Sequence, residues 1–200
     1  MITKIAWSLL AFSFSVFAGF EEGVDAFMRG DYPRAANEWA PLAKSGDPDA
    51  ARNLARLYHE GLGVRQDFSQ ARKLYQVAAK KCNATAQNNL GLLLLNGQGG
   101  EKDPVEAFRL FHSAANQGLP EDSDAMGNLG GLYLGGTGTQ QNVVEAYKWY
   151  YLYMTYTTNG ENRRKLQALL PQIEAQLSSV QKSEAIRRAQ NFRPARCTLN

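Results

Sequence analysis

Residues 50–79 read AARNLARLYHEGLGVRQDFSQARKLYQVAA, and this stretch decides the fold because its pattern recurs along the chain. The positions that recur after 36 residues are Ala50, Leu54, Gly61, Gly63, Ala71, Tyr75 and Ala78, which return as Ala86, Leu90, Gly97, Gly99, Ala107, Phe111 and Ala114. Most of the set returns again 39 residues later, over 125–150. Seven matches at one fixed offset indicate internal repeats.

Each repeat predicts two helices. Apolar residues at helical spacing over 50–58 give the first helix one apolar face. Gly61 and Gly63 then supply the left-handed backbone that ends a helix, and Asp67 can cap the second helix, which is apolar over 71–78. A single helical pair leaves apolar surface uncovered, so neighbouring pairs must stack. The predicted fold is all-α, a right-handed α-solenoid of stacked helical hairpins with one concave surface lined by the first helices.

The repeat resembles a known family. Its pattern, A-x-x-N-L-[AG]-x-L-Y-x-x-G-x-G-x-x-x-D-x-x-x-A-x-x-x-Y-x-x-A-A, is similar to that of the Sel-one-like repeats, relatives of the tetratricopeptide repeat. It fits 50–79 and 86–115, and fits 125–150 more loosely. In the third copy, four glycines crowd the first helix and Asn142 replaces the expected Asp, which leaves the rigidity of this hairpin open. The resemblance implies a protein-binding scaffold or adaptor.

The repeats organise nearly the whole chain. The predicted segments are a signal peptide at 1–18, a tetratricopeptide-like hairpin at 19–46, repeats at 47–82, 83–118 and 123–160, and C-terminal capping helices with a basic tail at 161–200. In the last segment we expect a helix over 162–177 with a kink at Pro171. A capping box at Ser178 then begins a final helix that ends at Asn191 and buries Ala185, Ala189 and Phe192.

The first 18 residues predict export. Lys4 precedes an apolar run over 5–17, and the small residues around Ala18 are typical of a signal-peptidase site. The run is shorter than the roughly 20 residues that span a bilayer. No later segment is apolar enough to do so, which predicts a mature chain without a transmembrane span in the periplasm or outside the cell.

Export permits a disulfide between the two cysteines, Cys82 and Cys197. Such a bridge would close a loop of about 115 residues and stabilise the fold by roughly 4–5 kcal/mol on the chain-entropy model. Two separate thiols fit the sequence equally well, since spacing does not show whether the two Cα atoms come within bonding distance.

The charge distribution is uneven. Residues 19–160 carry 13 basic and 16 acidic side chains, whereas residues 161–200 carry 8 and 3. The basic residues are spread along predicted helices, which favours a solvated helical face, and no nucleic-acid binding is predicted.

The tetratricopeptide register implies which residues line the concave surface. The predicted groove residues are Arg52, Arg56 and His59 in the first repeat and Asn88, Leu92 and Leu95 in the second, followed by Gly127, Gly131 and Leu134 in the third. This surface changes from cationic to apolar and suits a peptide with an acidic end and an apolar end. Solvated arginines are the competing interpretation. Asn53, Asn89 and Asn128 share one repeat position, where a structural role is favoured over ligand binding.

The aromatic run over 147–156 offers a second candidate surface. Tyr147, Tyr151 and Tyr153 cannot all be interior on one helix, so some of them are a candidate patch for protein or cell-wall glycan. The competing interpretation packs them against the C-terminal helices.

The sequence lacks the residues of an enzyme. Its two histidines, His59 and His112, lie in different repeats at different phases, so neither a metal cluster nor a catalytic triad can be drawn. The sequence therefore predicts no catalytic, metal or cofactor site. It favours an exported, non-catalytic scaffold or adaptor that binds a protein or peptide, with a cell-wall-binding protein as the alternative.

Overall fold

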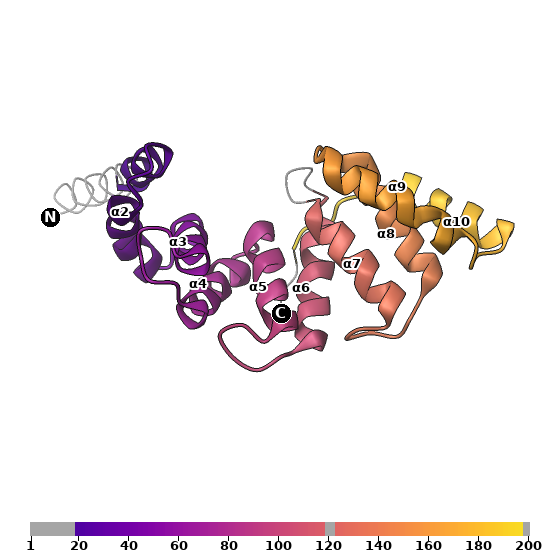
Figure 1. The fold of residues 1–200 in the computed structure, drawn as a ribbon, viewed down its shortest axis with the longest axis horizontal. Helices are drawn as coiled ribbons and strands as arrows, with labels where there is room; N and C mark the ends of the chain where they lie inside the picture. Colours follow the sequence, from indigo (N-terminus) through magenta and orange to yellow (C-terminus); the bar gives the residue numbers. More distant parts are fainter. Residues whose placement is uncertain (1–18, 119–122, 198–200) are drawn as a thin grey trace, which may run out of the picture. The chain divides into compact units, whose positions relative to one another are not determined.

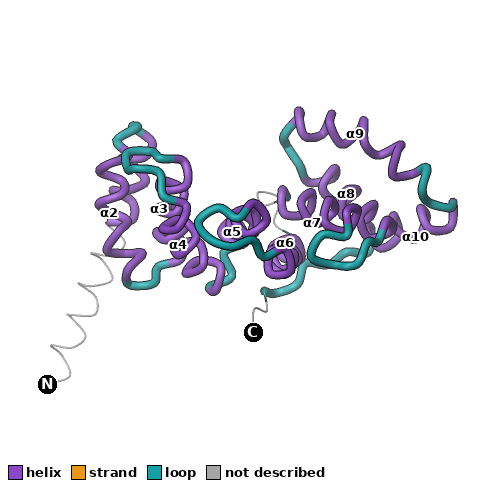
Figure 2. Tube along the Cα trace, turned by 60° about the horizontal axis from the view of Figure 1, so that its bottom comes forward, coloured by secondary structure: helices purple, strands orange, loops and turns teal. Residues whose placement is uncertain are grey.

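All regular secondary structure in the described part of the chain is helical (Figure 2). The computed structural model describes residues 19–118 and 123–197, so the predicted signal peptide and the loop at 119–122 lie outside the described residues. The chain divides into two units, residues 1–83 and residues 84–200. Each unit consists of helical hairpins that follow one another in chain order (Figure 1).

The first unit contains the opening hairpin and the first full repeat. After a helix at 19–28, its helices are α2 (Tyr32–Lys44), α3 (Pro48–Glu60) and α4 (Phe68–Lys80). Trp39 of α2 is buried, its indole Nε1 donates to the Phe20 carbonyl at 3.3 Å, and its ring lies 5.9 Å from that of Phe27. Helix α3 packs against both α2 and α4, so the predicted hairpins share an apolar core.

The second unit contains two further hairpins and the C-terminal helices. Its helices are α5 (Ala84–Asn96), α6 (Pro104–Gln117), α7 (Asp124–Gly135), α8 (Val143–Tyr156), α9 (Gly160–Glu174) and α10 (Ser179–Gln190). Helices α5 and α6 pair, α7 and α8 pair, and α6 packs against α7. Helices α9 and α10 both pack against α8. The prediction of an all-α fold of sequential helical hairpins is confirmed.

The repeated turn residues act as the pattern predicts. The glycines that end or follow the first helix of each repeat all have positive φ: Gly61, Gly63, Gly97, Gly99, Gly136 and Gly138. The side chains of Asp67, Asp103 and Asn142 each accept a hydrogen bond from the backbone N–H three residues later, at 2.9, 2.9 and 3.0 Å. Asn142 therefore caps α8 with the same geometry as the aspartates, because Asn and Asp offer the same acceptor oxygen.

The glycines inside the first helices make room for aromatic rings. A Cβ at Gly91 would lie 2.8 Å from the Phe111 ring, and one at Gly130 would lie 3.1 Å from the Tyr150 ring. These two pairs occupy the same repeat positions. Side chains at these sites would overpack the contact between the helices of a hairpin. The glycines that crowd α7 thus include positions where a ring packs directly on the helix backbone.

The C-terminal helices differ in detail from the prediction. Helix α9 begins at Gly160, continues past Pro171 and ends at Glu174, three residues before the expected end. After Glu174 the chain forms a tighter turn, in which the N–H groups of Gln176 and Leu177 donate to the carbonyls three residues earlier. Ser178 then has an extended backbone, with φ −67° and ψ 159°, and caps α10. The predicted capping box is confirmed, since Gln181 N–H donates to Ser178 Oγ and Ser178 N–H donates to Gln181 Oε1. Ala185 and Ala189 are buried as expected, and Phe192 is half-buried.

Candidate functional site

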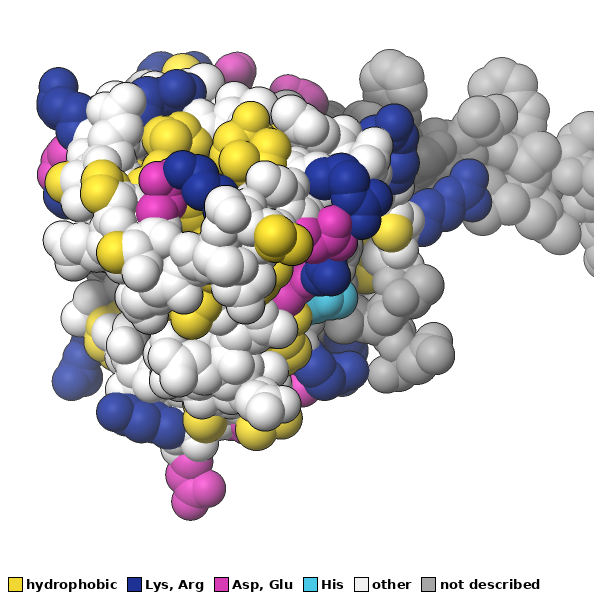
Figure 3. Space-filling model, turned by 90° about the vertical axis from the view of Figure 1, so that its right-hand side faces the viewer, with side chains coloured by type: hydrophobic (Ala, Val, Ile, Leu, Met, Phe, Trp, Pro, Cys, Tyr) yellow, Lys and Arg dark blue, Asp and Glu magenta, His cyan; other side chains and the backbone are white. Residues whose placement is uncertain are grey.

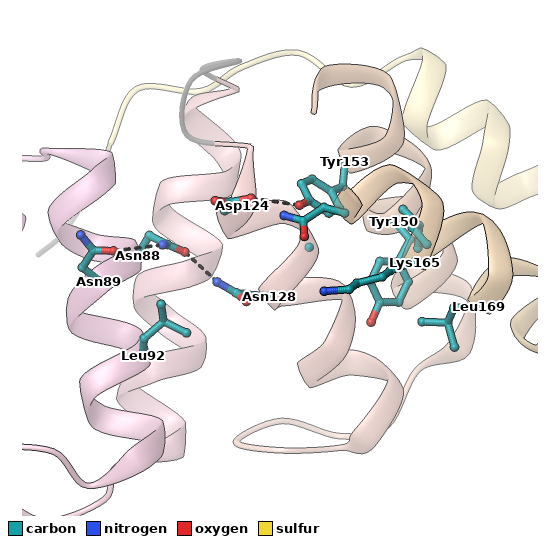
Figure 4. A pocket seen from close by; sticks show the side chains of 12 residues that line it. Asn88, Asn89, Leu92, Asp124, Asn128, Tyr150, Tyr153, Lys165 and Leu169 are labelled. Atoms are coloured by element: carbon teal, nitrogen blue, oxygen red, sulfur yellow. Dashed lines mark hydrogen bonds between the residues drawn. The ribbon is translucent and has the colours of Figure 1, made fainter. Parts of the chain in front are cut away.

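The second unit contains a cavity of about 490 Å³ between α5, α7, α8 and α9. In Figure 4 the side chains of α5 lie on one side, and those of α8 and α9 lie on the other. Its lining, hereafter the amide pocket, consists of Asn88, Asn89, Leu92, Asp124, Gly127, Asn128, Tyr150, Tyr153, Asn162, Lys165, Leu166 and Leu169. A volume of this size suits a short peptide segment or a small molecule.

Three asparagine side chains form a row along the α5 and α7 wall. Asn128 Nδ2 donates to Asn88 Oδ1 at 2.8 Å, and Asn88 Nδ2 donates to Asn89 Oδ1 at 3.4 Å (Figure 4). Asn88 is only 9% exposed, so the row is anchored in the interior. Each primary amide has two N–H donors and a carbonyl acceptor. The bond from Asn128 to Asn88 uses one of the two Asn128 N–H groups. Asn128 was expected to have a structural role, and here it both joins two hairpins and lines the pocket.

The α8 side of the amide pocket is formed by Tyr150 and Tyr153. Gly127 admits the Tyr153 ring, because a Cβ there would lie 2.9 Å from it. The Tyr153 hydroxyl donates to Asp124 Oδ1 at 2.9 Å. Burial raises the pKa of both tyrosine hydroxyls, which are therefore neutral donors at physiological pH.

Helix α9 closes the amide pocket with an apolar ridge and one cation. Leu166 is buried and Leu169 is half-buried, while Lys165 is exposed and reaches across the pocket toward Asn128 (Figure 4). Lys165 Nζ lies 2.6 Å from Glu161 Oε1, one helical turn earlier.

A hydrogen-bond network holds α9 in place. The Tyr147 hydroxyl of α8 donates to Glu174 Oε1 at 2.6 Å, and Lys182 Nζ of α10 donates to Glu174 Oε2 at 2.6 Å. The hydrogen bonds from Lys182 and Tyr147 lower the pKa of the Glu174 carboxyl. Burial, together with the bond to this carboxylate, raises the pKa of Tyr147. Glu174 thereby connects three helices at the end of α9.

The sequence predicted part of this pocket. Of the predicted groove residues in the second unit, Asn88, Leu92 and Gly127 line it, whereas Leu95, Gly131 and Leu134 lie outside the lining. The contribution of α9 was missed, because the C-terminal helices were expected only to cover the end of the stack.

The predicted groove arginines line a separate cavity of about 300 Å³ within the first unit. The guanidinium of Arg56 lies 5.1 Å from the centroid of the Phe27 ring, and its Nε donates to Glu60 at 2.8 Å. Arg52 lies 3.6 Å from Asp49. His59 is not part of this lining, because its ring packs edge-on against Phe68 and Tyr75.

The three tyrosines of the candidate patch do not share a surface. Tyr147 is 3% exposed and Tyr153 is 8% exposed, while Tyr151 is half-buried. The burial of Tyr147 and Tyr153 favours the competing interpretation, in which these side chains pack against the C-terminal helices. The physical reason is that neighbours cover α8 on several sides, namely α7, α9 and α10, so residues that point in different directions are all enclosed.

A third cavity, of about 320 Å³, lies beside His112, Ser113 and Cys197. Desolvation lowers the pKa of His112, and Ser113 Oγ lies 3.6 Å from Cys197 Sγ. Cys197 is disulfide-bonded, so it is not an ionisable thiol nucleophile. Within residues 19–118 and 123–197, no group of three or more His, Cys, Asp or Glu side chains could hold a metal ion.

Four of the eight basic residues over 161–200 form ion pairs. The pairs join Lys165 to Glu161, Lys182 to Glu174, Arg187 to Glu184, and Arg188 to both Glu184 and Glu145. On the face shown in Figure 3, Lys and Arg side chains are scattered among acidic and uncharged ones. A dispersed surface of this kind agrees with a solvated helical face.

The state of the cysteines indicates an oxidising compartment. Cys82 in the first unit and Cys197 in the second are both disulfide-bonded, and neither thiol is free. Disulfides persist outside the reducing cytoplasm, so this pairing suggests an extracytoplasmic location. Among the described helices, none is both long and apolar enough to cross a membrane.

Comparison with known proteins identifies the repeat. The family model of the Sel1 repeat matches residues 48–81, 84–119 and 123–152, half of the chain. A Sel1 repeat protein from Oxalobacter formigenes is 31% identical with a TM-score of 0.64, over 70% of this chain and 56% of that one. A protective antigen of uropathogenic Escherichia coli strains, which displays an SLR fold, is 25% identical with a TM-score of 0.56, over 88% of this chain and 45% of that one.

The two solved relatives are longer than this chain. The chain spans about half the length of the two solved relatives. A search of curated proteins gives no match. The repeat matches nevertheless follow the hairpins α3–α4, α5–α6 and α7–α8 one by one. The chain belongs to the Sel1 repeat family.

Proposed function

We propose that this protein is a non-catalytic scaffold that binds an extended segment of a partner protein in the amide pocket. The observation that carries the proposal is the asparagine row, which presents amide groups along a wall of the pocket. The main chain of an extended peptide offers alternating N–H and C=O groups, which amide side chains can bond in either direction. Leucines beside the row can bury the side chains of the same peptide.

The first unit offers a second contact of the same kind. We propose that Arg52 and Arg56 bind acidic side chains of a partner, since both guanidinium groups line the cavity beside Phe27. Their present ion-pair partners, Asp49 and Glu60, are themselves exposed, so these pairs stabilise the fold little.

Export is the setting that we propose for this activity. The apolar run near the N-terminus predicts a cleavable signal peptide at 1–18, and the disulfide-bonded cysteines fit the periplasm or the outside of the cell. We also propose that the chain is organised as a hairpin at 19–46, three repeats at 47–82, 83–118 and 123–160, and a C-terminal segment from 161.

The cell-wall alternative has less support. Sugar rings bind proteins partly by stacking on aromatic faces, but one face of the Tyr153 ring packs against Gly127 and one face of the Tyr150 ring packs against Gly130. Tyr147 is buried and bonded to Glu174. The aromatic run therefore contributes mainly to packing.

A displayed peptide library tests the proposed function. The purified chain would be used to select binders, whose affinities are then compared for Asn128→Ala and for Asn96→Ala, a control at an exposed position of α5 outside the lining. We expect Asn128→Ala to weaken binding about 5-fold, the equivalent of one hydrogen bond, and Asn96→Ala to leave it unchanged. Failure to enrich any peptide, or equal affinities for the two variants, would show that the amide pocket is not the binding site.

A further inference from the structure

We propose that the amide pocket is specific for an extended peptide that places an acidic side chain beside an apolar one. Lys165 binds the acid, and the apolar side chain lies between α5 and α9. This inference rests on the proposed function and names the chemical class of its ligand. It assigns to α9 a part in recognition, in addition to its place at the end of the hairpin array.

The two charged side chains of the pocket differ in how well they are compensated. Asp124 accepts the hydrogen bond from the Tyr153 hydroxyl. It also lies in the first turn of α7, where the helix dipole favours a negative charge. Asp124 is thus already stabilised by groups of the protein itself.

Lys165 is compensated much more weakly. Its partner Glu161 lies on the same helix, and the two side chains are 69% and 66% exposed, so water screens their attraction. Figure 4 shows the ammonium group on the pocket side of α9, facing Asn128. A ligand carboxylate placed between these two side chains can accept from both the ammonium and an amide N–H, in surroundings that leucines make less polar than water.

Leucines on opposite walls of the pocket would bind the apolar side chain of the ligand. Leu92 of α5 and Leu169 of α9 are both half-buried, and both line the pocket. An apolar side chain between them would remove their remaining surface from water. Because the cation and the apolar ridge lie on the same helix, within two turns of each other, the acid and the apolar side chain belong to neighbouring residues of the ligand.

Matched peptides test this specificity directly. The probes are octapeptides of alanine and serine, blocked at both ends, that carry either Leu-Glu or Leu-Gln at the centre. Blocked ends make the glutamate side chain the only carboxylate. Affinities for the full chain are measured by calorimetry for the native protein, for Lys165→Gln and for Arg164→Gln. Arg164 is the matched control, since it is an exposed cation next to Lys165 on α9 that does not line the pocket.

We expect the native chain and Arg164→Gln to bind the Leu-Glu peptide about 5- to 20-fold more tightly than the Leu-Gln peptide, as a charge-assisted hydrogen bond provides. In Lys165→Gln this ratio should fall to about 1, with little change in the affinity for Leu-Gln. A Lys165→Glu chain should in turn prefer a Leu-Lys peptide.

Three results would overturn the inference: no preference for Leu-Glu in the native chain, a ratio that survives in Lys165→Gln, or an equal loss in Arg164→Gln. Displacement of the peptides by a soluble cell-wall oligosaccharide would also overturn it, in favour of a glycan site. If neither these probes nor library peptides bind at all, the proposed function itself fails. Binding through Asn128 without any dependence on Lys165 would refute only the acidic specificity.

Discussion

In hairpin α5–α6, Gly91 faces the fully buried ring of Phe111, whereas in α7–α8 the equivalent Gly130 faces Tyr150, which is half-buried and lines the amide pocket. Gly127 adds a second such contact in α7–α8 by admitting the Tyr153 ring. Asn88, which occupies the matching position of α5, instead extends its amide toward Asn128. Gly127, which diverges from the other repeats, and Gly130 therefore have a definite role: they allow tyrosine rings close to the α7 backbone and shape the pocket.

The largest expected effect comes from the two equivalent rings. Phe111→Ala should lower the free energy of unfolding by about 3–5 kcal/mol, because it opens a cavity in a closed core. Tyr150→Ala should cost less, about 1–3 kcal/mol, since its ring is half-buried and water can enter the space. Urea unfolding followed by circular dichroism measures both values. Equal costs would mean that the two hairpins pack alike and that the comparison is wrong.

A second prediction compares alanine substitutions at two glycines of α7. Gly127→Ala should destabilise the fold by about 1–2 kcal/mol, because the new methyl group would lie 2.9 Å from the Tyr153 ring. Gly131→Ala, where the nearest atom is the Tyr150 hydroxyl at 3.4 Å, should be neutral or stabilise by up to about 1 kcal/mol through helix propensity. The measurement is thermal unfolding of both variants. A stabilised Gly127→Ala would show that the glycine does not serve ring packing.

The attachment of α9 should depend on pH. Hydrogen bonds from Lys182 and Tyr147 lower the pKa of Glu174 in the folded protein, so this carboxylate stabilises the fold above its unfolded pKa, near 4.3. The contribution is lost as the pH falls below that value, through the folded pKa. Removing one of these bonds by Tyr147→Phe should cost about 1 kcal/mol at pH 7. The difference in midpoint temperature between this variant and the native chain should shrink between pH 5 and pH 3.

The control for this effect is Tyr151→Phe, which changes a half-buried tyrosine of the same helix that makes no bond to Glu174. Its unfolding temperature should differ from that of the native chain by the same small amount at every pH. A pH-independent difference for Tyr147→Phe as well would remove Glu174 from the attachment of α9.

The smallest expected effect concerns the cap of the third repeat. Asn142→Asp should change stability by less than about 0.5 kcal/mol, since both side chains cap the N-terminus of α8 with one oxygen. Asn142→Ala should cost about 1 kcal/mol because it leaves the Glu145 N–H without its acceptor. Thermal unfolding at pH 7 ranks the three chains. A strong gain from Asn142→Asp would indicate that the third repeat is weakened at this cap.

Sequence reasoning predicts what is local and periodic. The recurring Gly61 and Gly63, the cap at Asp67 and the capping box at Ser178 follow from short-range hydrogen bonding and backbone freedom, so they are readable within a few residues. The family resemblance extends this to the order of the hairpins. Three of the predicted groove residues that line the amide pocket, Asn88, Leu92 and Gly127, also follow from a repeat position carried from one hairpin to the next.

What the sequence did not predict depends on contacts between distant segments. No local pattern says that α9 would lie along the pocket, because its position is set by Tyr147 and Lys182, which bond Glu174 from two other helices. The same contacts enclose Tyr147, which on an isolated helix would be exposed. From the sequence alone, glycines within α7 predict a less stable helix. In the structure, Gly127 and Gly130 make room for the rings of Tyr153 and Tyr150.

The most direct test of the central claim is a map of the residues that a bound peptide touches. We would titrate the isotope-labelled chain with a library-selected peptide and follow its backbone and asparagine side-chain amide signals by nuclear magnetic resonance. The expected result is a set of concentrated shifts at the side chains of Asn88 and Asn128 and along α9 near Lys165. Shifts confined to other helices, with the asparagine row and α9 unchanged, would contradict the claim that the diverged third repeat and α9 together form the binding site.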